Sequence, residues 1–424
     1  MSNRCIASAA AAVLALLSCL VSPSLADNTA WSIDNVVRIA VASHPLVSQA
    51  DEEILAAGAR KGQAESSYYP VVGVSTGYSR ARSFSPLSHQ SSTVTTDFLQ
   101  GTVSQTIADF GRTGAAVDKA GALLSYAKET GRSVRADVVF AAKAGYYSVL
   151  RAQRIMEVSL ETVRQRESLL RQAKAYYDAG IRAKIDVARA EANLFQARAE
   201  LTAAENDLQV ARITLLNRMG IEGPRDFTLK DSFTTESYPG TLEEWVKEAE
   251  GNRPELRALL EKERAAEMAL RGARAGYLPI LTGVGGIGYA ADEFPLEQNF
   301  NVTVQLTVPV FSGFLTRQQV AEALAQLSSA RHAVTDFRRL VRLQVEQSAL
   351  SVRSSLEQSD ARRKEREASG ENLLLATGRY EVGVGDIIEM IDAQVQMSRS
   401  DTQYIDALYG YNLSVATLQR AIGK

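Results

Sequence analysis

Cysteine is nearly absent from this 424-residue chain, and both of its cysteines lie within residues 1–26. That segment carries a single arginine, an apolar run at 9–21 and small residues up to Ala26. These features are typical of a secretory signal peptide, so we predict cleavage after Ala26. The mature chain would then have no cysteine, which excludes a disulfide framework. The alternative is a lipoprotein signal at 16–19, which would leave Cys19 acylated.

Long apolar runs and an excess of one charge are also missing. No stretch of 18 or more apolar residues follows the signal segment, so we expect no transmembrane helix. Lys and Arg total 47 against 49 Asp and Glu, a formal charge of −2, so no basic surface suggests nucleic acid. The chain has only three histidines, and His44 next to Pro45 is expected to cap or flank a helix start.

Residue patterns for catalysis are missing as well. Isolated histidines without cysteine give no zinc spacing, and neither G-x-S-x-G nor H-E-x-x-H occurs. Gly283–Gly288 spells G-x-G-x-x-G, but a loop pattern follows it instead of the helix that a pyrophosphate site needs. We therefore expect no catalytic, cofactor-binding or metal site, and predict that the protein is not an enzyme.

Proline is scarce, with ten in the chain, and residues 112–178 and 317–380 contain none. At about 1.5 Å per residue, the first of these segments would form a helix about 100 Å long. Helices of that length are rare in globular proteins and favour a coiled-coil body. Return helices are predicted at about 184–218 and 385–421.

The predicted return helices carry a seven-residue pattern. Large residues recur every seven positions, and a small residue follows most of them three positions later. Such a repeat keeps facing a partner helix only if the helices supercoil, and the small residues permit a close approach. The large positions are Val187, Leu194, Leu201, Leu208 and Leu215, then Met390, Met397, Tyr404, Tyr411 and Leu418; the small ones are Ala190, Ala197, Ala204 and Ala211, then Ala393, Ser400, Ala407 and Ser414.

Two prolines mark a change from helical period to alternation. After Tyr69-Pro70 and Leu278-Pro279, apolar and polar residues alternate, which predicts β-hairpins at about 70–108 and 279–309. We expect their loops at 80–96 and 290–299. One apolar and one polar face fit either a half-buried sheet or a transmembrane barrel with a wet lumen. Four strands cannot close a barrel, so the membrane interpretation requires at least two copies.

The chain repeats itself. Segments around Pro45 and Pro70 recur 209 residues later, and Tyr177-x-x-Gly180, Asp186 and Met219-Gly220 recur 203 residues later. We predict an internal duplication with repeat 1 at 27–231 and repeat 2 at 232–424. Each repeat would contain a first helix, a β-hairpin, a long helix and a return helix.

These motifs together resemble the outer membrane factor family, the TolC-like outer membrane efflux proteins. The resemblance rests on the Pro-bounded first helices, on Ser104–Ile107 with Val304–Pro309, and on Tyr380–Gly383 followed by Ile387–Ala393. It implies an α+β membrane protein, a trimer whose four transmembrane strands per protomer close a 12-stranded β-barrel in contact with outer-membrane lipid. The long helices would form a coiled-coil barrel in the periplasm of a Gram-negative bacterium, and residues 221–240 would join a belt around it.

The function implied by the resemblance is an exit duct of a tripartite efflux pump or a type I secretion system. Such a duct passively conducts substrate from an inner-membrane pump of the RND or ABC type, through a periplasmic adaptor, to the outside. The resemblance does not identify the cargo, the pump or the adaptor. The alternative is a periplasmic coiled-coil adaptor or another structural protein of an export complex, although an adaptor normally has one helical hairpin and this chain predicts two.

The resemblance also implies a gate at the periplasmic end. Glu389 and Asp392, one helical turn apart, would form an acidic ring that attracts cations, with Asp186 as the first-repeat counterpart of Glu389. From the residues alone, the same acids fit a solvated helix face.

A second implied feature is a latch among a Tyr, an Arg and an Asp near this turn. Tyr380 and Asp186 are in place, but Gly385 occupies the position expected for the arginine. Arg182 and Arg379 are the nearby arginines, so we expect a rewired or weaker latch.

Overall fold

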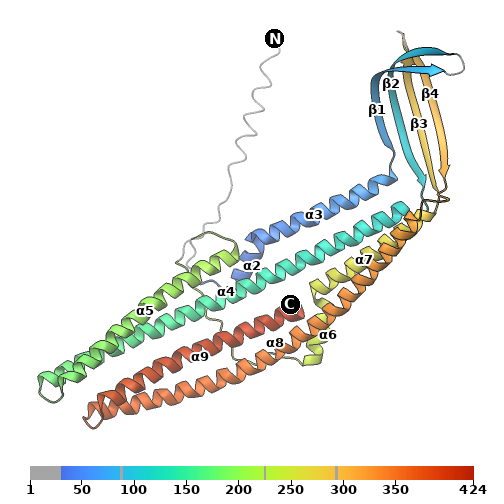
Figure 1. Cartoon of the computed structure of the whole chain (residues 1–424). Coiled ribbons are helices and arrows are strands. Elements are labelled where there is room, and N and C mark those ends of the chain that lie inside the picture. Colours follow the sequence, from blue (N-terminus) through green and yellow to red (C-terminus); the bar gives the residue numbers. More distant parts are fainter. Residues whose placement is uncertain (1–29, 86–88, 224–225, 292–294) are drawn as a thin grey trace, which may run out of the picture.

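The computed structural model describes residues 30–85, 89–223, 226–291 and 295–424. The predicted signal peptide, with Cys19, lies outside these residues. Figure 1 shows an elongated helical body with a four-stranded sheet at one end. The chain passes from the body into the sheet twice, and each time it returns along the whole body through one long helix.

The first half contains six main elements, and the second half repeats them in the same order. Corresponding helices have identical lengths of 11, 21, 67 and 36 residues. Among the residues that the structure describes, no helix has both the length and the apolar character needed to cross a bilayer. The first-half elements are α2 (Ile33–Ser43), α3 (Pro45–Glu65), β1 (Val71–Ser85), β2 (Gln90–Ala108), α4 (Arg112–Asp178) and α5 (Lys184–Met219). Those of the second half are α6 (Leu242–Asn252), α7 (Pro254–Arg274), β3 (Ile280–Ala291), β4 (Glu297–Thr307), α8 (Leu315–Glu381) and α9 (Ile387–Ile422).

The first helix of each half is divided in two at a proline. Pro45 and Pro254 begin α3 and α7, because proline at the first position of a helix lacks only an N–H that would be unpaired anyway. The residue before a proline is forced out of the helical region, and His44 accordingly has φ −72° and ψ 124°. Its Nδ1 accepts a hydrogen bond from the Leu46 N–H at 3.2 Å, so His44 caps α3 as expected.

Each return helix ends against the backbone where the first helix is divided, at 43–45 or 252–254; we call these two places the elbows. Gly220 and Gly423, which follow α5 and α9, both adopt positive φ, at +68° and +84°. A Cβ on Gly220 would lie 2.6 Å from the Cα of His44, and one on Gly423 would lie 3.0 Å from the carbonyl carbon of Asn252. The repeated glycine therefore has a physical reason, because only glycine combines that backbone conformation with so close an approach.

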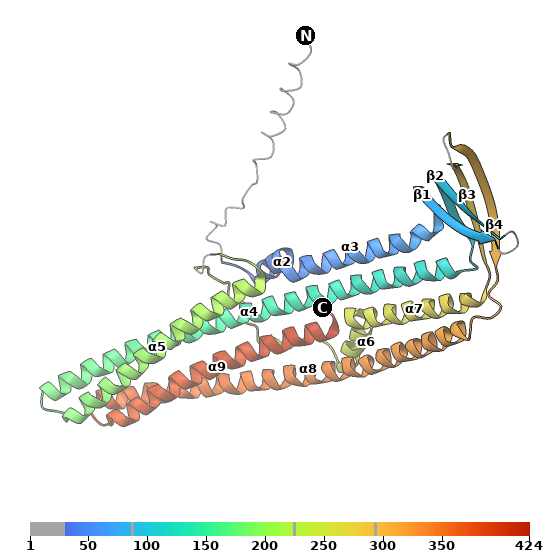
Figure 2. The ribbon, with the colours of Figure 1, turned by 45° about the horizontal axis from the view of Figure 1, so that its top comes forward.

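The helical body is organised around α4. Its half nearer the sheet packs on α3 and α7, and its other half packs on α5 and α9 (Figure 2). The small residues that were predicted to let α5 approach its partner closely are all buried: Ala190, Ala197, Ala204 and Ala211. In α9 the corresponding Ala393, Ser400 and Ser414 are buried, whereas Ala407 is half-buried.

The sheet is antiparallel in the order β1-β2-β3-β4. Directly paired residues such as Val72 with Val103, or Ile287 with Phe300, share one apolar face, and this face is exposed in the single chain. The predicted loops at 80–96 and 290–299 were too long, because pairing continues to Ser85, from Gln90, to Ala291 and from Glu297. Backbone hydrogen bonds carry the strands through the Ser- and Thr-rich part of β1 and β2, where apolar alternation fades. The G-x-G-x-x-G segment lies within β3.

Candidate functional site at the helical tip

Two helical turns form the end of the body that lies farthest from the sheet. The α4–α5 turn spans 179–183 and the α8–α9 turn spans 382–386; together we call them the tip (Figure 1). Gly180 and Gly383 take positive φ, +73° and +78°, in equivalent places. Five of the six predicted site residues lie in the tip or within one helical turn of it, and Asp392 lies further along α9.

Gly385 closes the α8–α9 turn at a place where a side chain would be crowded. Its N–H donates to the Arg379 carbonyl at 2.8 Å, and an added Cβ would come within 3.0 Å of the Arg379 carbonyl carbon and the Tyr380 nitrogen. A side chain at this position would require the last turn of α8 to shift by a few tenths of an ångström. The turn that this sequence forms therefore disfavours the arginine expected there.

An arginine of the other half makes the contact instead. Arg182 Nη2 donates to the Gly385 carbonyl oxygen at 2.8 Å, and the guanidinium lies 5.7 Å from the centre of the Tyr380 ring. Tyr380 is fully buried, with its ring 5.9 Å from that of Tyr176 on α4. Burial raises the pKa of Tyr380, so its hydroxyl stays neutral. The Arg182–Gly385 hydrogen bond and the packing of Arg182 and Tyr176 against the Tyr380 ring thereby join the two turns of the tip.

The three acids occupy different surroundings. Asp186 is buried in the first turn of α5, where the helix dipole favours a carboxylate, and no described residue links it to Tyr380 by a hydrogen bond. Glu389 is exposed and pairs with Arg379 at 3.3 Å. Asp392 is exposed on the same side of α9. The structure therefore brings Arg182 to Tyr380 and Arg379 to Glu389, and leaves Asp392 in solvent.

An apolar cluster behind the tip holds two helical hairpins together, α4–α5 and α8–α9. It combines residues of α4, α5, α8 and α9, so both halves contribute to one core. The heptads predicted that Ala190 and Met390 pack on partner helices, but not that the two hairpins would share them. The buried members are Leu169, Ala173, Ala190, Tyr380, Ile387, Met390 and Ile391.

Polar pairs then follow the line of contact between α4 and α9. Arg166 donates to the Gln394 amide oxygen, and Thr162 and Ser398 share a hydrogen bond at 3.1 Å. Arg166 is buried, and desolvation lowers its pKa, partly offset by Glu200. Nearer the sheet, Arg151 pairs with Asp406 at 2.6 Å and Lys143 with Gln419 at 2.7 Å. We call these four pairs the α4–α9 ladder.

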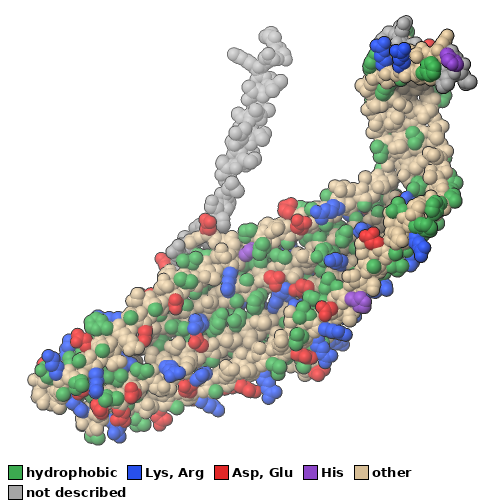
Figure 3. All heavy atoms as spheres, in the orientation of Figure 1, with side chains coloured by type: hydrophobic (Ala, Val, Ile, Leu, Met, Phe, Trp, Pro, Cys, Tyr) green, Lys and Arg blue, Asp and Glu red, His purple; other side chains and the backbone are tan. Residues whose placement is uncertain are grey.

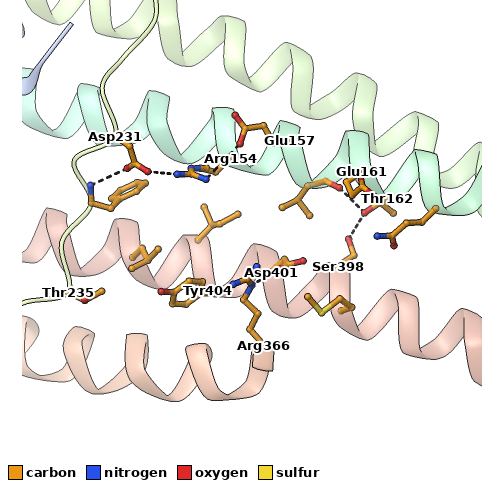
Figure 4. Close-up of a pocket in the computed structure, with 16 residues that line it drawn as sticks. Arg154, Glu157, Glu161, Thr162, Asp231, Thr235, Arg366, Ser398, Asp401 and Tyr404 are labelled. Carbon is orange, nitrogen blue, oxygen red and sulfur yellow. Dashed lines mark hydrogen bonds and ion pairs between the residues drawn. The ribbon is translucent and has the colours of Figure 1, made fainter. Parts of the chain in front are cut away.

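The ladder is interrupted by a cleft of about 580 Å³ between Arg151 and Thr162 (Figure 4). Side chains of α4, α8, α9 and the 231–235 segment line it. Arg154 pairs with Asp231 at one side, and Arg366 with Asp401 at another. The Arg151–Asp406 and Thr162–Ser398 pairs join the α4–α5 hairpin to the α8–α9 hairpin on either side of this cavity. Sequence reasoning missed both the ladder and the cleft, since polar residues that meet across two hairpins look like solvated ones along either helix.

Comparison with known proteins gives a consistent result. The family described as "Outer membrane efflux protein" matches residues 36–220 and 245–424. Outer membrane protein OprJ of Pseudomonas aeruginosa is 26% identical over 334 residues, covering 74% of this chain and 67% of that protein. Outer membrane protein TolC of Escherichia coli is 24% identical over 435 residues, covering 96% and 86%. The MtrE outer membrane channel of Neisseria gonorrhoeae, solved in its open state, superposes with a TM-score of 0.79 at 18% identity, covering 92% and 88%.

Proposed function

The chain belongs to the outer membrane efflux protein family, and we propose that it acts as a trimeric exit duct. It is a channel protein of the Gram-negative outer membrane with a large periplasmic part. The observation that carries the trimer proposal is the open four-stranded sheet at the end of 67-residue helices.

The sheet is incomplete by itself. Its outer strands β1 and β4 each have only one partner in the described chain, and four strands are too few to close a barrel. Three copies would supply twelve strands, an ordinary number for a transmembrane barrel. The apolar face supports this proposal, because Val74, Phe300 and Val302 are 77%, 80% and 80% exposed and need a lipid environment.

We propose that the tip is the gate of this duct. The Arg182–Gly385 hydrogen bond, the buried Tyr380 and the apolar cluster hold the α8–α9 helical hairpin against α4. Opening would require α8–α9 to move away from α4 and break these contacts. Glu389 and Asp392 are exposed on α9, and in a trimer they would add six carboxylates around the axis and favour cations.

The tip also suggests where partners bind. Ile181, Val382 and Val384 are 66%, 75% and 74% exposed, although they stand at the end of a highly charged helical body. Exposed apolar side chains of this kind favour a protein contact. We propose that they bind the helical hairpin of a periplasmic adaptor, which connects the duct to an inner-membrane pump of the RND or ABC type. The pump would supply the energy, and the duct would conduct passively without catalysis.

Membrane fractionation followed by detergent extraction tests this proposal. We expect the protein in the outer-membrane fraction, a mass three times that of the mature chain after chemical cross-linking, and discrete single-channel currents in planar bilayers. A protein that stays in the soluble fraction as a monomer would exclude the duct. A membrane-bound trimer without currents would exclude the conducting function alone.

A further inference from the structure

Two arginines continue the lipid-facing side of β1 beyond its apolar part. Successive side chains of a strand alternate between faces, so Arg80 and Arg82 share the face of Val72, Val74 and Tyr78. Both arginines are exposed. They stand near the end of the sheet that is farthest from the helices, where basic side chains appear beyond a sheet surface that is otherwise nearly free of charge (Figure 3).

The height of the apolar band places these arginines at the membrane surface. The eight residue steps from Pro70 to Tyr78 extend about 26 Å along the strand, or about 20 Å along the membrane normal at a tilt of about 40°. That height is close to the apolar band of about 25 Å in outer-membrane barrels, which aromatic residues border on both sides. Tyr78, which is 63% exposed and shares the face of Val72 and Val74, occupies the outer border. Arg80 and Arg82 then lie about 5 and 10 Å further out, at the depth of the outer headgroups.

Acidic residues on this face do not neutralise the pair. Within the described part of the chain, neither Arg80 nor Arg82 forms an ion pair; Asp97 shares their face but lies opposite Tyr78. Glu297 pairs with Ala290 and therefore faces the other side of the sheet, with the lumen. The two guanidinium groups are thus available from the lipid side. Planar guanidinium groups match phosphate oxygens in paired hydrogen bonds.

We propose that Arg80 and Arg82 bind the phosphate groups of phosphorylated lipid headgroups in the outer leaflet. The proposal rests on the trimeric barrel, which would carry six such arginines around its rim. The second β-hairpin, β3–β4, does not repeat the site. Its strands are 12 and 11 residues long, against 15 and 19 for β1 and β2. The outward residues at this end of β4 are Gln298 and Phe300. The site therefore occurs once per protomer.

Lipid binding by the purified trimer tests the proposal. The variant is R80Q/R82Q, and the matched control is R338Q/R339Q, which removes two exposed arginines of α8 far from the sheet. The probes are a bisphosphorylated glycolipid, phosphatidylcholine and inorganic phosphate, and native mass spectrometry counts bound lipid at each concentration. We expect R80Q/R82Q to bind the glycolipid about tenfold to thirtyfold more weakly than wild type and control. All three proteins should bind phosphatidylcholine equally.

Three outcomes would overturn the proposal. Equal glycolipid binding by R80Q/R82Q and wild type would exclude the arginines. Full displacement of the glycolipid by inorganic phosphate at equal concentration would assign the site to free phosphate. A wild-type protein that forms no trimer would refute the proposed function, and this inference with it, whereas a conducting trimer without glycolipid preference refutes the inference alone.

Discussion

The two halves of the chain agree in their helices and differ in their ends. Each pair of corresponding helices has the same length, including the 67-residue α4 and α8. The strands differ by up to eight residues, and the tips differ in which side chains they carry. Helices that lie side by side in one wall must keep a common length and register, because each added residue shifts every later packing position by about 100°. The ends face solvent, lipid or partners and are free of that constraint.

The elbows and the tips show this difference at the level of single residues. At both elbows, a glycine with positive φ meets the backbone before a proline, so the halves use the same contact. At the tips, Arg182 and Gly385 stand at equivalent positions, 203 residues apart, yet one donates and the other accepts the same hydrogen bond. The two halves therefore use the same contact where each return helix ends, and different, complementary groups in the two turns of the tip.

The largest effect is expected from valine at an elbow. Gly220→Val should lower the free energy of unfolding by about 3–5 kcal/mol, because a β-branched residue at positive φ is strained and its Cβ would collide with the His44 backbone. Gly180→Val is the matched control, since Gly180 has a similar φ and nothing within 4 Å of its Cβ position. It should cost only about 1–2 kcal/mol. Denaturant unfolding followed by circular dichroism measures both, and equal losses would show that the elbow contact contributes nothing.

The ladder gives the second largest effect. Gln394→Leu leaves the buried Arg166 guanidinium without its acceptor, and we expect a loss of about 2–4 kcal/mol. Arg166→Met combined with Gln394→Leu should recover most of this loss, because an apolar pair has no charge to solvate. Gln396→Leu, at an exposed site of the same helix, is the control and should be near neutral. A double variant that is less stable than Gln394→Leu would mean that the pair contributes more than its desolvation costs.

Patterns within one element were enough to predict most helix and strand positions. The proline-free segments predicted α4 at 112–178, which the structure places at Arg112–Asp178, and the predicted second long helix at 317–380 lies at Leu315–Glu381. These elements are long and strongly periodic. The strands were predicted too short at their loop ends, because the Ser- and Thr-rich residues after Tyr78 alternate too weakly in hydrophobicity, although the backbone pairs through them.

Contacts between the halves were beyond the reach of such patterns. Asp186 and Glu389 are equivalent in the repeat, but Asp186 is buried, whereas Glu389 is exposed and pairs with Arg379. Likewise, Arg166 and Gln394 are 228 residues apart and meet only through the register of two separate hairpins. The resemblance placed Gly385 where an arginine is expected, but the role of Gly385 as an acceptor follows from the turn that it forms.

A third prediction tests whether a contact between the two halves of the chain holds the proposed gate closed. Arg182→Gln removes the hydrogen bond between the tips, and a charge-assisted bond of about 1–2 kcal/mol corresponds to a fivefold to thirtyfold rise in open population. Arg379→Gln is the comparison, because Arg379 pairs with Glu389 inside the second hairpin and moves with it. It should change open probability less than twofold. Single-channel recording measures both, and a larger effect of Arg379→Gln would place the latch within one half.

The smallest effect is expected for ion selectivity. Glu389→Ala with Asp392→Ala should reduce the preference for cations over anions by about twofold to fivefold, because these exposed carboxylates would face the permeating ions. Reversal potentials in a salt gradient measure the change.

Asp186→Asn tests whether the first half of the chain contributes to ion selectivity. Asp186 is the counterpart of Glu389 but is only 8% exposed, so its charge would be hidden from the ions and the variant should keep the wild-type reversal potential. If Asp186→Asn shifted the potential as much as the double variant, the acidic ring would draw on both halves and Asp186 would have to become exposed when the duct conducts. If neither variant shifted it, the acids would be ordinary solvated residues of the helix face.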